Sequence, residues 1–137
     1  MQLPIKAHYA TLAMLALAEK HESGGVLPAR VIAREQNIPS QFLGQILQQL
    51  RAAGLIASTR GANGGFYLQT TPTEITVGDV VDAVCPGSSG LPVEGASPLS
   101  ALVLEVWDEV KARQRELLDR LTLADLLGRQ THAMFYI

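Results

Sequence analysis

The strongest constraint on the fold is a pair of short helical patterns joined by a tight turn. The first spans about residues 28–35 and the second about residues 41–53. Between them, Pro39 disfavours a helical conformation in the residue before it, and the Ser40 hydroxyl is placed to accept a hydrogen bond from a free N–H of the second helix. The second helix has an apolar side, formed by Phe42, Leu43, Ile46, Leu47 and Leu50, and a polar, uncharged side, formed by Gln41, Gly44, Gln45, Gln48 and Gln49. Gly54 closes this helix as a left-handed cap. This order predicts a helix-turn-helix.

The residues after Gly54 change to the alternating pattern of short strands. Two such runs, residues 55–59 and 66–68, flank a glycine-rich loop that contains the pair Asn63-Gly64. Because Asn and Gly both tolerate positive φ, this pair favours a tight hairpin between the strands. A hairpin directly after a helix-turn-helix is a wing, so the pattern predicts a winged helix-turn-helix.

Two further helices are predicted on either side of this unit. Residues 6–20 are rich in Ala and Leu, with apolar residues at helical spacing. Thr76 and Asp79 have the spacing of a capping box and begin a helix that ends near Val84.

A long helix is predicted in the C-terminal third of the chain. Ser97 is placed to cap it and Pro98 to occupy its first position, and its pattern continues to about Leu121. Residues 122–129 indicate one more short helix. The long helix has two apolar sides. The simplest interpretation is a core helix, but because the helix follows a complete winged-helix domain, pairing with the same helix of a second chain explains the two sides better. Its expected dimer contacts are Leu99, Leu102, Val103, Val106 and Val110.

These elements predict a mainly α fold with a small β-hairpin wing. We expect a winged helix-turn-helix domain over residues 1–84 and a flexible loop, rich in Gly, Pro and Ser, over residues 85–97. Residues 98–137 then form the dimerisation helix and a C-terminal tail.

The charges are distributed unevenly along the chain. The chain has 11 basic and 13 acidic residues, a net charge of −2. Residues 1–70 hold 6 basic and 3 acidic residues (6 − 3 = +3), so residues 71–137 hold 5 and 10 (5 − 10 = −5). This asymmetry indicates one anionic partner bound by the first half. No apolar run reaches membrane-span length, so we expect no membrane partner and a cytoplasmic location.

The sequence offers little support for catalysis or metal binding. The single cysteine, Cys85, excludes an intramolecular disulfide and is either a redox switch or an inert core residue. The three histidines (His8, His21 and His132) have no metal-ligand spacing with each other or with Cys85. No pair of carboxylates or nucleophile–base arrangement stands out. We therefore expect neither an enzyme nor a bound cofactor.

The polar side of the second helix has the chemistry to read DNA bases. Gln41, Gln45 and Gln48 share one face, and a Gln amide can donate to one edge atom of adenine and accept from another. The alternative is an ordinary solvated helix face, since Gln is a good helix former.

Several other residues are placed to contact the DNA backbone. Arg60 lies at the shoulder of the hairpin, where its charge and planar fork suit phosphates or a minor groove. Lys6 and Tyr9 lie one turn apart and could both touch phosphates, although Tyr9 is nearly as well explained as a core aromatic. The expected DNA surface comprises Lys6, Tyr9, Ser40, Gln41, Gln45, Gln48, Arg60, Asn63 and Gly64.

A set of motifs runs through nearly the whole chain. The motifs are Lys6-x-x-Tyr9-Ala10, Ile32-Ala33-Arg34-x-x-x-Ile38, Phe42-Leu43-x-Gln45-Ile46-Leu47, Leu50-Arg51-x-Ala53-Gly54-Leu55-Ile56, Arg60-Gly61-Ala62-x-Gly64-Gly65-Phe66-x-Leu68 and Ile75-Thr76-Val77-Gly78-Asp79-Val80-Val81. Together they resemble the Rrf-two family of bacterial winged helix-turn-helix transcriptional regulators.

The resemblance implies a homodimer that binds a pseudo-palindromic DNA operator, usually as a repressor. Its recognition helix would span residues 41–50 and its wing residues 60–66. The chain departs from the family at Gly44, where members commonly carry an acidic residue. It also has one cysteine where cluster-binding members have three, and an iron–sulfur cluster needs four ligands, mostly thiolates.

We therefore expect no iron–sulfur cluster. The chain resembles the cluster-free branch, which senses a small molecule, a protein partner or thiol oxidation. The competing interpretation is a winged-helix protein-interaction module that does not bind DNA.

Overall fold

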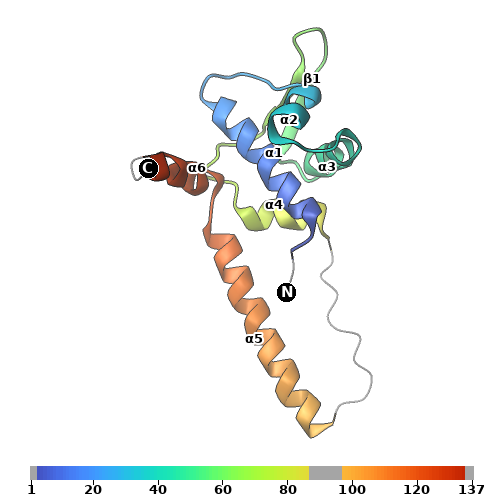
Figure 1. The fold of residues 1–137 in the computed structure, drawn as a ribbon, viewed down its shortest axis with the longest axis vertical. Helices are drawn as coiled ribbons and strands as arrows, with labels where there is room; N and C mark the ends of the chain where they lie inside the picture. The colour runs from blue at the N-terminus through green and yellow to red at the C-terminus, as the bar shows by residue number, and fades with distance from the viewer. Residues whose placement is uncertain (1–2, 87–96, 135–137) are drawn as a thin grey trace.

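The computed structural model describes residues 3–86 and 97–134. A compact body carries a hairpin at one end, and a single long helix projects from the other (Figure 1). In chain order the elements are α1 (Ile5–His21), α2 (Ala29–Gln36), α3 (Ser40–Ala52), β1 (Ile56–Thr59), β2 (Gly65–Leu68), α4 (Val77–Val84), α5 (Pro98–Arg120) and α6 (Leu123–Met134). The predicted mainly α fold with a β-hairpin wing is confirmed.

The turn between α2 and α3 differs from the prediction in one detail. Asn37 ends α2 in the left-handed region at φ 55°, and Pro39 is the extended residue before α3. Ser40 is already the first residue of α3, and no side chain caps this helix. The prediction that the Ser40 hydroxyl caps α3 is therefore wrong, because Pro39 takes the capping position and brings no side-chain acceptor.

The hairpin forms where the sequence predicts it, but its loop is longer than a tight turn and has its left-handed residue at another position. β1 and β2 are antiparallel and pair from Ile56 with Leu68 to Thr59 with Gly65, which leaves five residues in the loop. Neither residue of the Asn63-Gly64 pair has positive φ among the described backbone angles; Gly61 does, at 109°. Gly64 is needed for a different reason, since a Cβ there would collide with the Thr59 carbonyl oxygen. A five-residue loop does not require the left-handed pair of a two-residue turn.

A short antiparallel bridge attaches the hairpin to the body. The Leu27 N–H donates to the Phe66 carbonyl at 3.0 Å, and the Phe66 N–H donates to the Leu27 carbonyl at 2.8 Å. The two segments approach so closely here that a Cβ on Gly65 would lie 2.6 Å from the Leu27 carbonyl group. The orientation of the wing thus depends on glycine at position 65.

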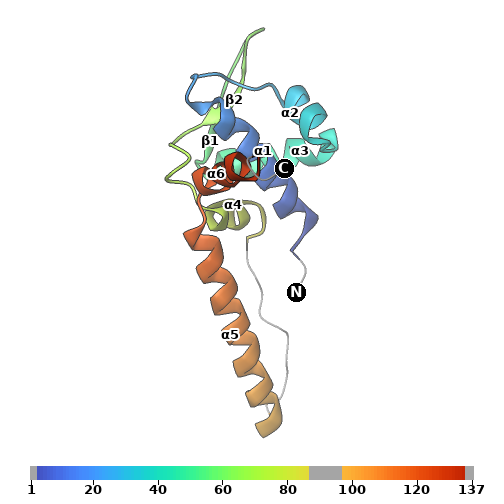
Figure 2. The same ribbon diagram turned by 60° about the vertical axis from the view of Figure 1, so that its left-hand side comes forward.

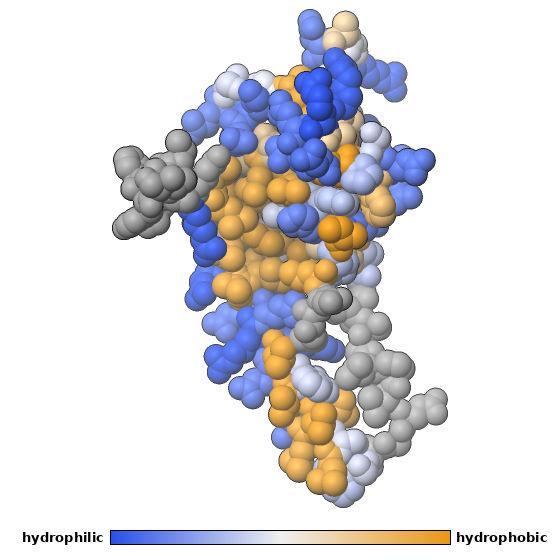
Figure 3. All heavy atoms as spheres, in the orientation of Figure 1, coloured by the Kyte–Doolittle hydropathy of each residue, from blue (hydrophilic) through white to orange (hydrophobic). Residues whose placement is uncertain are grey.

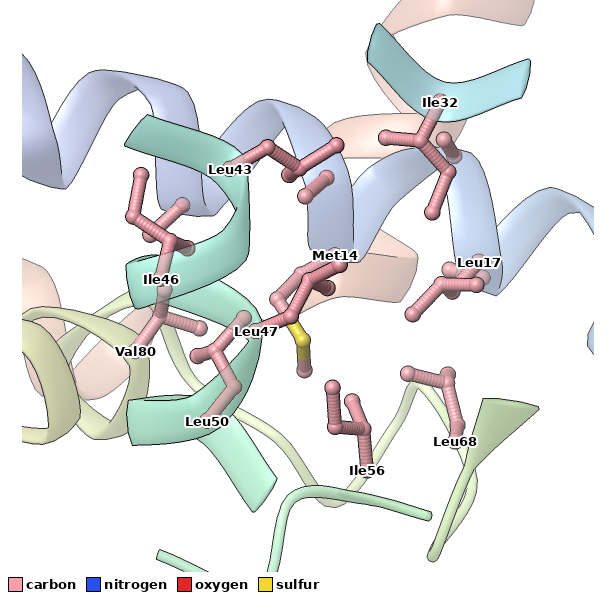
Figure 4. Packing of buried hydrophobic residues seen from close by; sticks show 14 of the residues in the cluster. Met14, Leu17, Ile32, Leu43, Ile46, Leu47, Leu50, Ile56, Leu68 and Val80 are labelled. Atoms are coloured by element: carbon pink, nitrogen blue, oxygen red, sulfur yellow. The ribbon is translucent and has the colours of Figure 1, made fainter. Parts of the chain in front are cut away.

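The core lies where α1 passes between the other elements of the body. Ala10 and Ala13 of α1 are fully buried, and these small side chains let neighbouring helices approach closely. Figure 4 shows the apolar side chains that converge on α1 from α2, α3, the hairpin and α4. The largest buried side chains are Met14, Leu17, Ile32, Leu43, Ile46, Leu50, Ile56, Ile75, Val80 and Leu123.

Local sequence signals fix the starts of the C-terminal helices. Thr76 and Asp79 form the predicted capping box of α4, and Ser97 caps α5 with Pro98 in its first turn. α6 runs on to Met134 instead of ending near Arg129, because no Gly or Pro follows Arg129 to stop it.

α5 and α6 relate to the body in opposite ways. No residue of α5 is fully buried, whereas Leu123 at the start of α6 belongs to the core of the body. Figure 2 shows α5 pointing away while α6 returns beside α1. The predicted division of the chain into residues 1–84, 85–97 and 98–137 stays a prediction. Most of the predicted loop 85–97 lies outside the described residues, as do residues 135–137.

Candidate nucleic-acid interface

The outward face of α3 is made of the three predicted glutamines. Gln41, Gln45 and Gln48 are all exposed, and Gly44 lies exposed among them. The opposite face is anchored in the core by Leu43, Ile46, Leu47 and Leu50. Burial of that second face fixes the rotation of α3, so the three amides must point away from the body.

Two residues at the edge of this face differ from their predicted places. Phe42, expected on the apolar side, remains 44% exposed, and its ring meets Tyr9 of α1 edge-on at 5.9 Å between centroids. Gln49, expected on the polar side, is half-buried, and its Oε1 is buried with no hydrogen-bond partner in the described part of the chain. Both lie at the boundary between the two sides of α3, where helical spacing does not decide burial.

The structure places Tyr9 between its two predicted roles. It is half-buried against the core, and its ring also lies 6.1 Å from that of His8, which is exposed. Tyr9 thus connects the first half of α1 to α3. Lys6 is half-buried on the turn before Tyr9, and Ser40 is exposed at the start of α3.

The remaining predicted contacts belong to the hairpin loop. Arg60 and Asn63 are exposed, and Gly64 is half-buried. The loop lies at the end of the body opposite α5 (Figure 1). Helix α3 and the loop therefore present the candidate residues on separate parts of one body, in the arrangement of a recognition helix and a wing.

The first half of α5 presents a continuous apolar stripe. The five predicted dimer residues are exposed: Leu99 by 74%, Leu102 by 58%, Val103 by 49%, Val106 by 53% and Val110 by 40%. Trp107, at 41%, widens the stripe. Figure 3 shows this apolar surface at the end of α5 farthest from the body, separated by a hydrophilic band from a second apolar area on the body.

An apolar groove of about 420 Å³ opens on the body beside the joint between α4 and α5. Leu3 and Ile5, both more than half exposed, form one side of it. Val77, Val81 and Leu118 form another side. The sequence gives no direct signal for this groove, because its walls come from three segments far apart in the chain.

A charged cluster joins α5 to α4, and sequence reasoning missed it. The Arg115 guanidinium donates to both Asp82 carboxylate oxygens, at 2.6 and 2.9 Å, and to Asp119 one turn further along α5. The hydrogen bonds from Arg115 lower the pKa of the Asp119 carboxyl, and they raise the pKa of Arg115. Asp82 lies 33 residues before Arg115, too far for a helix-spacing rule to connect them.

Cys85 ends α4 as a half-buried free thiol. Its backbone N–H donates to the Val81 carbonyl at 2.8 Å, a structural contact that leaves both interpretations of the thiol open. Across residues 3–86 and 97–134 no group of three or more His, Cys, Asp or Glu side chains is placed to hold a metal ion. Within those same ranges no helix is long and apolar enough to cross a membrane.

Comparison with known proteins decides the family. The family model described as "Rrf2: Iron-dependent Transcriptional regulator" matches residues 3–129. The chain belongs to the Rrf2 (Rrf-two) family. It is 36% identical over its whole length to the HTH-type transcriptional regulator CymR of Bacillus subtilis, also over that protein's whole length. It is 36% identical to the regulator IscR of Aliivibrio salmonicida, over 93% of this chain and 77% of that protein.

Solved structures of this family superpose well on the chain. The match to T. potens IscR has a TM-score of 0.81 at 34% identity and covers 97% of this chain and 90% of the other. The match to CymR of B. subtilis, described as its global cysteine regulator, also has a TM-score of 0.81, at 33% identity over 94% and 98%. These relatives are transcriptional regulators, so the Rrf2 chain is a DNA-binding regulator of this type and not an enzyme.

An iron–sulfur cluster does not fit the cysteine content of this chain. A two-iron two-sulfur cluster takes four ligands, mostly cysteine thiolates. The sequence has Cys85 and no other cysteine. The chain therefore lacks the cysteine ligands that such a cluster requires.

Proposed function

We propose that this Rrf2 protein is a homodimeric, sequence-specific DNA-binding repressor. The observation that carries the proposal is the exposed, uncharged amide face of α3 in a helix-turn-helix followed by a wing. Gln41, Gln45 and Gln48 would read base edges in the major groove, where bidentate amide–adenine pairs discriminate between bases. Lys6, Tyr9, Ser40, Arg60, Asn63 and Gly64 would contact the backbone and fix the register.

The α5 stripe supports the homodimer. Leu99, Leu102, Val103, Val106 and Val110 recur at three- and four-residue spacing on one side of the helix, and they remain exposed in the single chain. A second copy would cover them and bring two recognition helices into a two-fold arrangement. Such a dimer matches a pseudo-palindromic operator with half-sites about one duplex turn apart.

The single cysteine supports sensing without an iron–sulfur cluster. A small molecule, a protein partner or oxidation of Cys85 would then supply the signal. Repression, rather than activation, rests on the family resemblance and would follow from an operator that overlaps a promoter.

Selection of bound duplexes from a random library tests the proposal. We expect an enriched inverted repeat whose two halves are alike, with full-length chain as the probe. Enrichment of a single unrepeated site would contradict the dimer, and no enrichment at all would favour the alternative, a winged-helix module that binds protein only. Mapping the enriched repeat onto promoters then distinguishes a repressor from an activator.

A further inference from the structure

The joint between α4 and α5 is the place where the body and the projecting helix are held together. Two backbone hydrogen bonds join the residues that follow α5 to the start of α4. The Val77 N–H donates to the Leu121 carbonyl at 2.8 Å, and the Leu123 N–H donates to the Ile75 carbonyl at 2.9 Å. These bonds anchor one end of the helix without setting its direction.

The direction of α5 requires a second attachment, and Arg115 supplies it. Arg115 lies six residues, roughly 9 Å along the helix, before the backbone attachment at Leu121. Its guanidinium group donates two hydrogen bonds to Asp82 of α4 and two more to Asp119 of α5. An isolated ion pair on the surface adds little to the stability of a protein. An Arg that binds two carboxylates with paired hydrogen bonds has the geometry in which surface ion pairs do add stability.

Gly78 of α4 brings the cluster close to the body. A Cβ at this position would lie 2.6 Å from an Arg115 nitrogen and would also collide with the Asp119 carboxylate. The glycine is buried in the first turn of α4. The Arg115 guanidinium group therefore lies directly against the α4 backbone, which leaves little room for movement between Arg115 and α4.

A small rotation at this joint has a large effect at the far end of α5. Leu99 lies 16 residues before Arg115, roughly 24 Å along a straight helix. All the exposed valines and leucines of the stripe from Leu99 to Val110 lie beyond the attachment, on the projecting part of the helix. The direction of α5 thus sets where the body of each chain stands relative to a partner bound through the stripe.

We propose that Arg115 is a positioning residue that fixes the direction of α5 and thereby the spacing of the two recognition helices in the dimer. The part concerning DNA rests on the proposed function. Each additional base pair moves a half-site by about 3.4 Å and turns it by about 35°. A dimer with a rigid joint between α4 and α5 should therefore bind operators of one half-site spacing, whereas a dimer with a loose joint should bind operators of several spacings.

The first test measures the direction of α5 without DNA. Spin labels are attached to the double variant Glu35→Cys and Asp108→Cys in a Cys85→Ser background, since both positions are exposed. The labelled protein is diluted with unlabelled chain, so that the measured distance is the one between body and helix within a single chain. We expect a narrow distance distribution for the parent protein and a clearly broader one for Arg115→Ala. Arg113→Ala is the matched control, because Arg113 is 77% exposed and its ion pair with Glu109, at 3.8 Å, stays within α5.

The second test measures spacing selectivity on inverted half-sites with the spacer changed by one base pair. When the spacer changes by one base pair, we expect the affinity of the parent and of Arg113→Ala to fall about tenfold, which is the typical cost of one mismatched base pair. The affinity of Arg115→Ala should fall about threefold or less. Asp82→Asn should behave like Arg115→Ala, and melting curves check that each variant is folded. An equally narrow distance distribution in Arg115→Ala, or equal selectivity in all variants, would overturn the proposal.

The two tests fail independently. If the parent protein binds no DNA, the proposed function fails, and the distance distribution still decides whether Arg115 fixes α5. If the parent binds DNA and Arg115→Ala behaves like Arg113→Ala in both tests, only the role of Arg115 fails.

Discussion

Truncation of one side chain in the α5 stripe should weaken the dimer by an amount that the structure allows us to estimate. Leu102 is 58% exposed in the single chain. Full burial of a Leu side chain is worth roughly 1.5–3 kcal/mol, so covering the exposed share contributes about 1–2 kcal/mol. Because a two-fold interface uses each residue twice, Leu102→Ala should cost about 2–4 kcal/mol per dimer.

This cost predicts a dissociation constant about 30- to 1,000-fold higher for Leu102→Ala. Sedimentation equilibrium measures it directly, since one chain is 14.7 kDa and the dimer twice that, 29.4 kDa. The matched control is Asp108→Ala, because Asp108 lies on α5 opposite the stripe and should leave the dimer unchanged. An unchanged dissociation constant in Leu102→Ala, or a parent protein that stays at 14.7 kDa, would refute the assignment of the stripe.

Three further predictions concern the wing, the joint and the DNA surface. Gly65→Ala should destabilise the chain by about 1–3 kcal/mol in urea unfolding, because its Cβ would lie 2.6 Å from the Leu27 carbonyl group. Gly44→Ala is the control, because a Cβ there meets nothing within 4 Å, and an equal loss of stability in both variants would contradict the close approach at Gly65. Arg115 lowers the pKa of Asp119, so the stability that the pair adds is present above pH 4 and lost as the pH falls through the lowered pKa. The stability difference between the parent and Arg115→Ala should therefore shrink as the pH falls below about 4, and a difference that stays constant down to the acid unfolding of the chain would contradict the role of Asp119. Arg60→Ala should weaken binding to all duplexes alike and reduce the slope of log affinity against log salt by about one, whereas an unchanged slope would exclude a phosphate contact.

The sequence predicts those parts of the fold that depend on local chemistry. The capping boxes at Thr76 and Ser97 and the left-handed Gly54 fix helix ends within a few residues, so the bounds of α4 and α5 follow from neighbouring residues. The outward face of α3 was predictable for a similar reason, because four apolar side chains at helical spacing must turn inward.

Features that depend on contacts between distant segments could not be predicted in this way. The Arg115–Asp82 pair and the close packing at Gly78 depend on how α5 meets α4. The turn of the hairpin depends on the loop length that the strand register leaves, which moved the left-handed residue to Gly61. Phe42 and Gln49 lie at the edge of a helix face, where helical spacing alone does not decide which of the two side chains is covered.

The proposed function requires the α3 face and the wing to bind a specific DNA sequence. The most direct measurement is a titration of the intact protein with its selected duplex and a scrambled duplex over a series of salt concentrations. We predict that log affinity falls linearly with log salt, by about 0.9 per phosphate contact, while the selected duplex stays preferred at every salt concentration. Absence of binding at low salt, or equal affinity for both duplexes at every salt concentration, would contradict sequence-specific DNA binding.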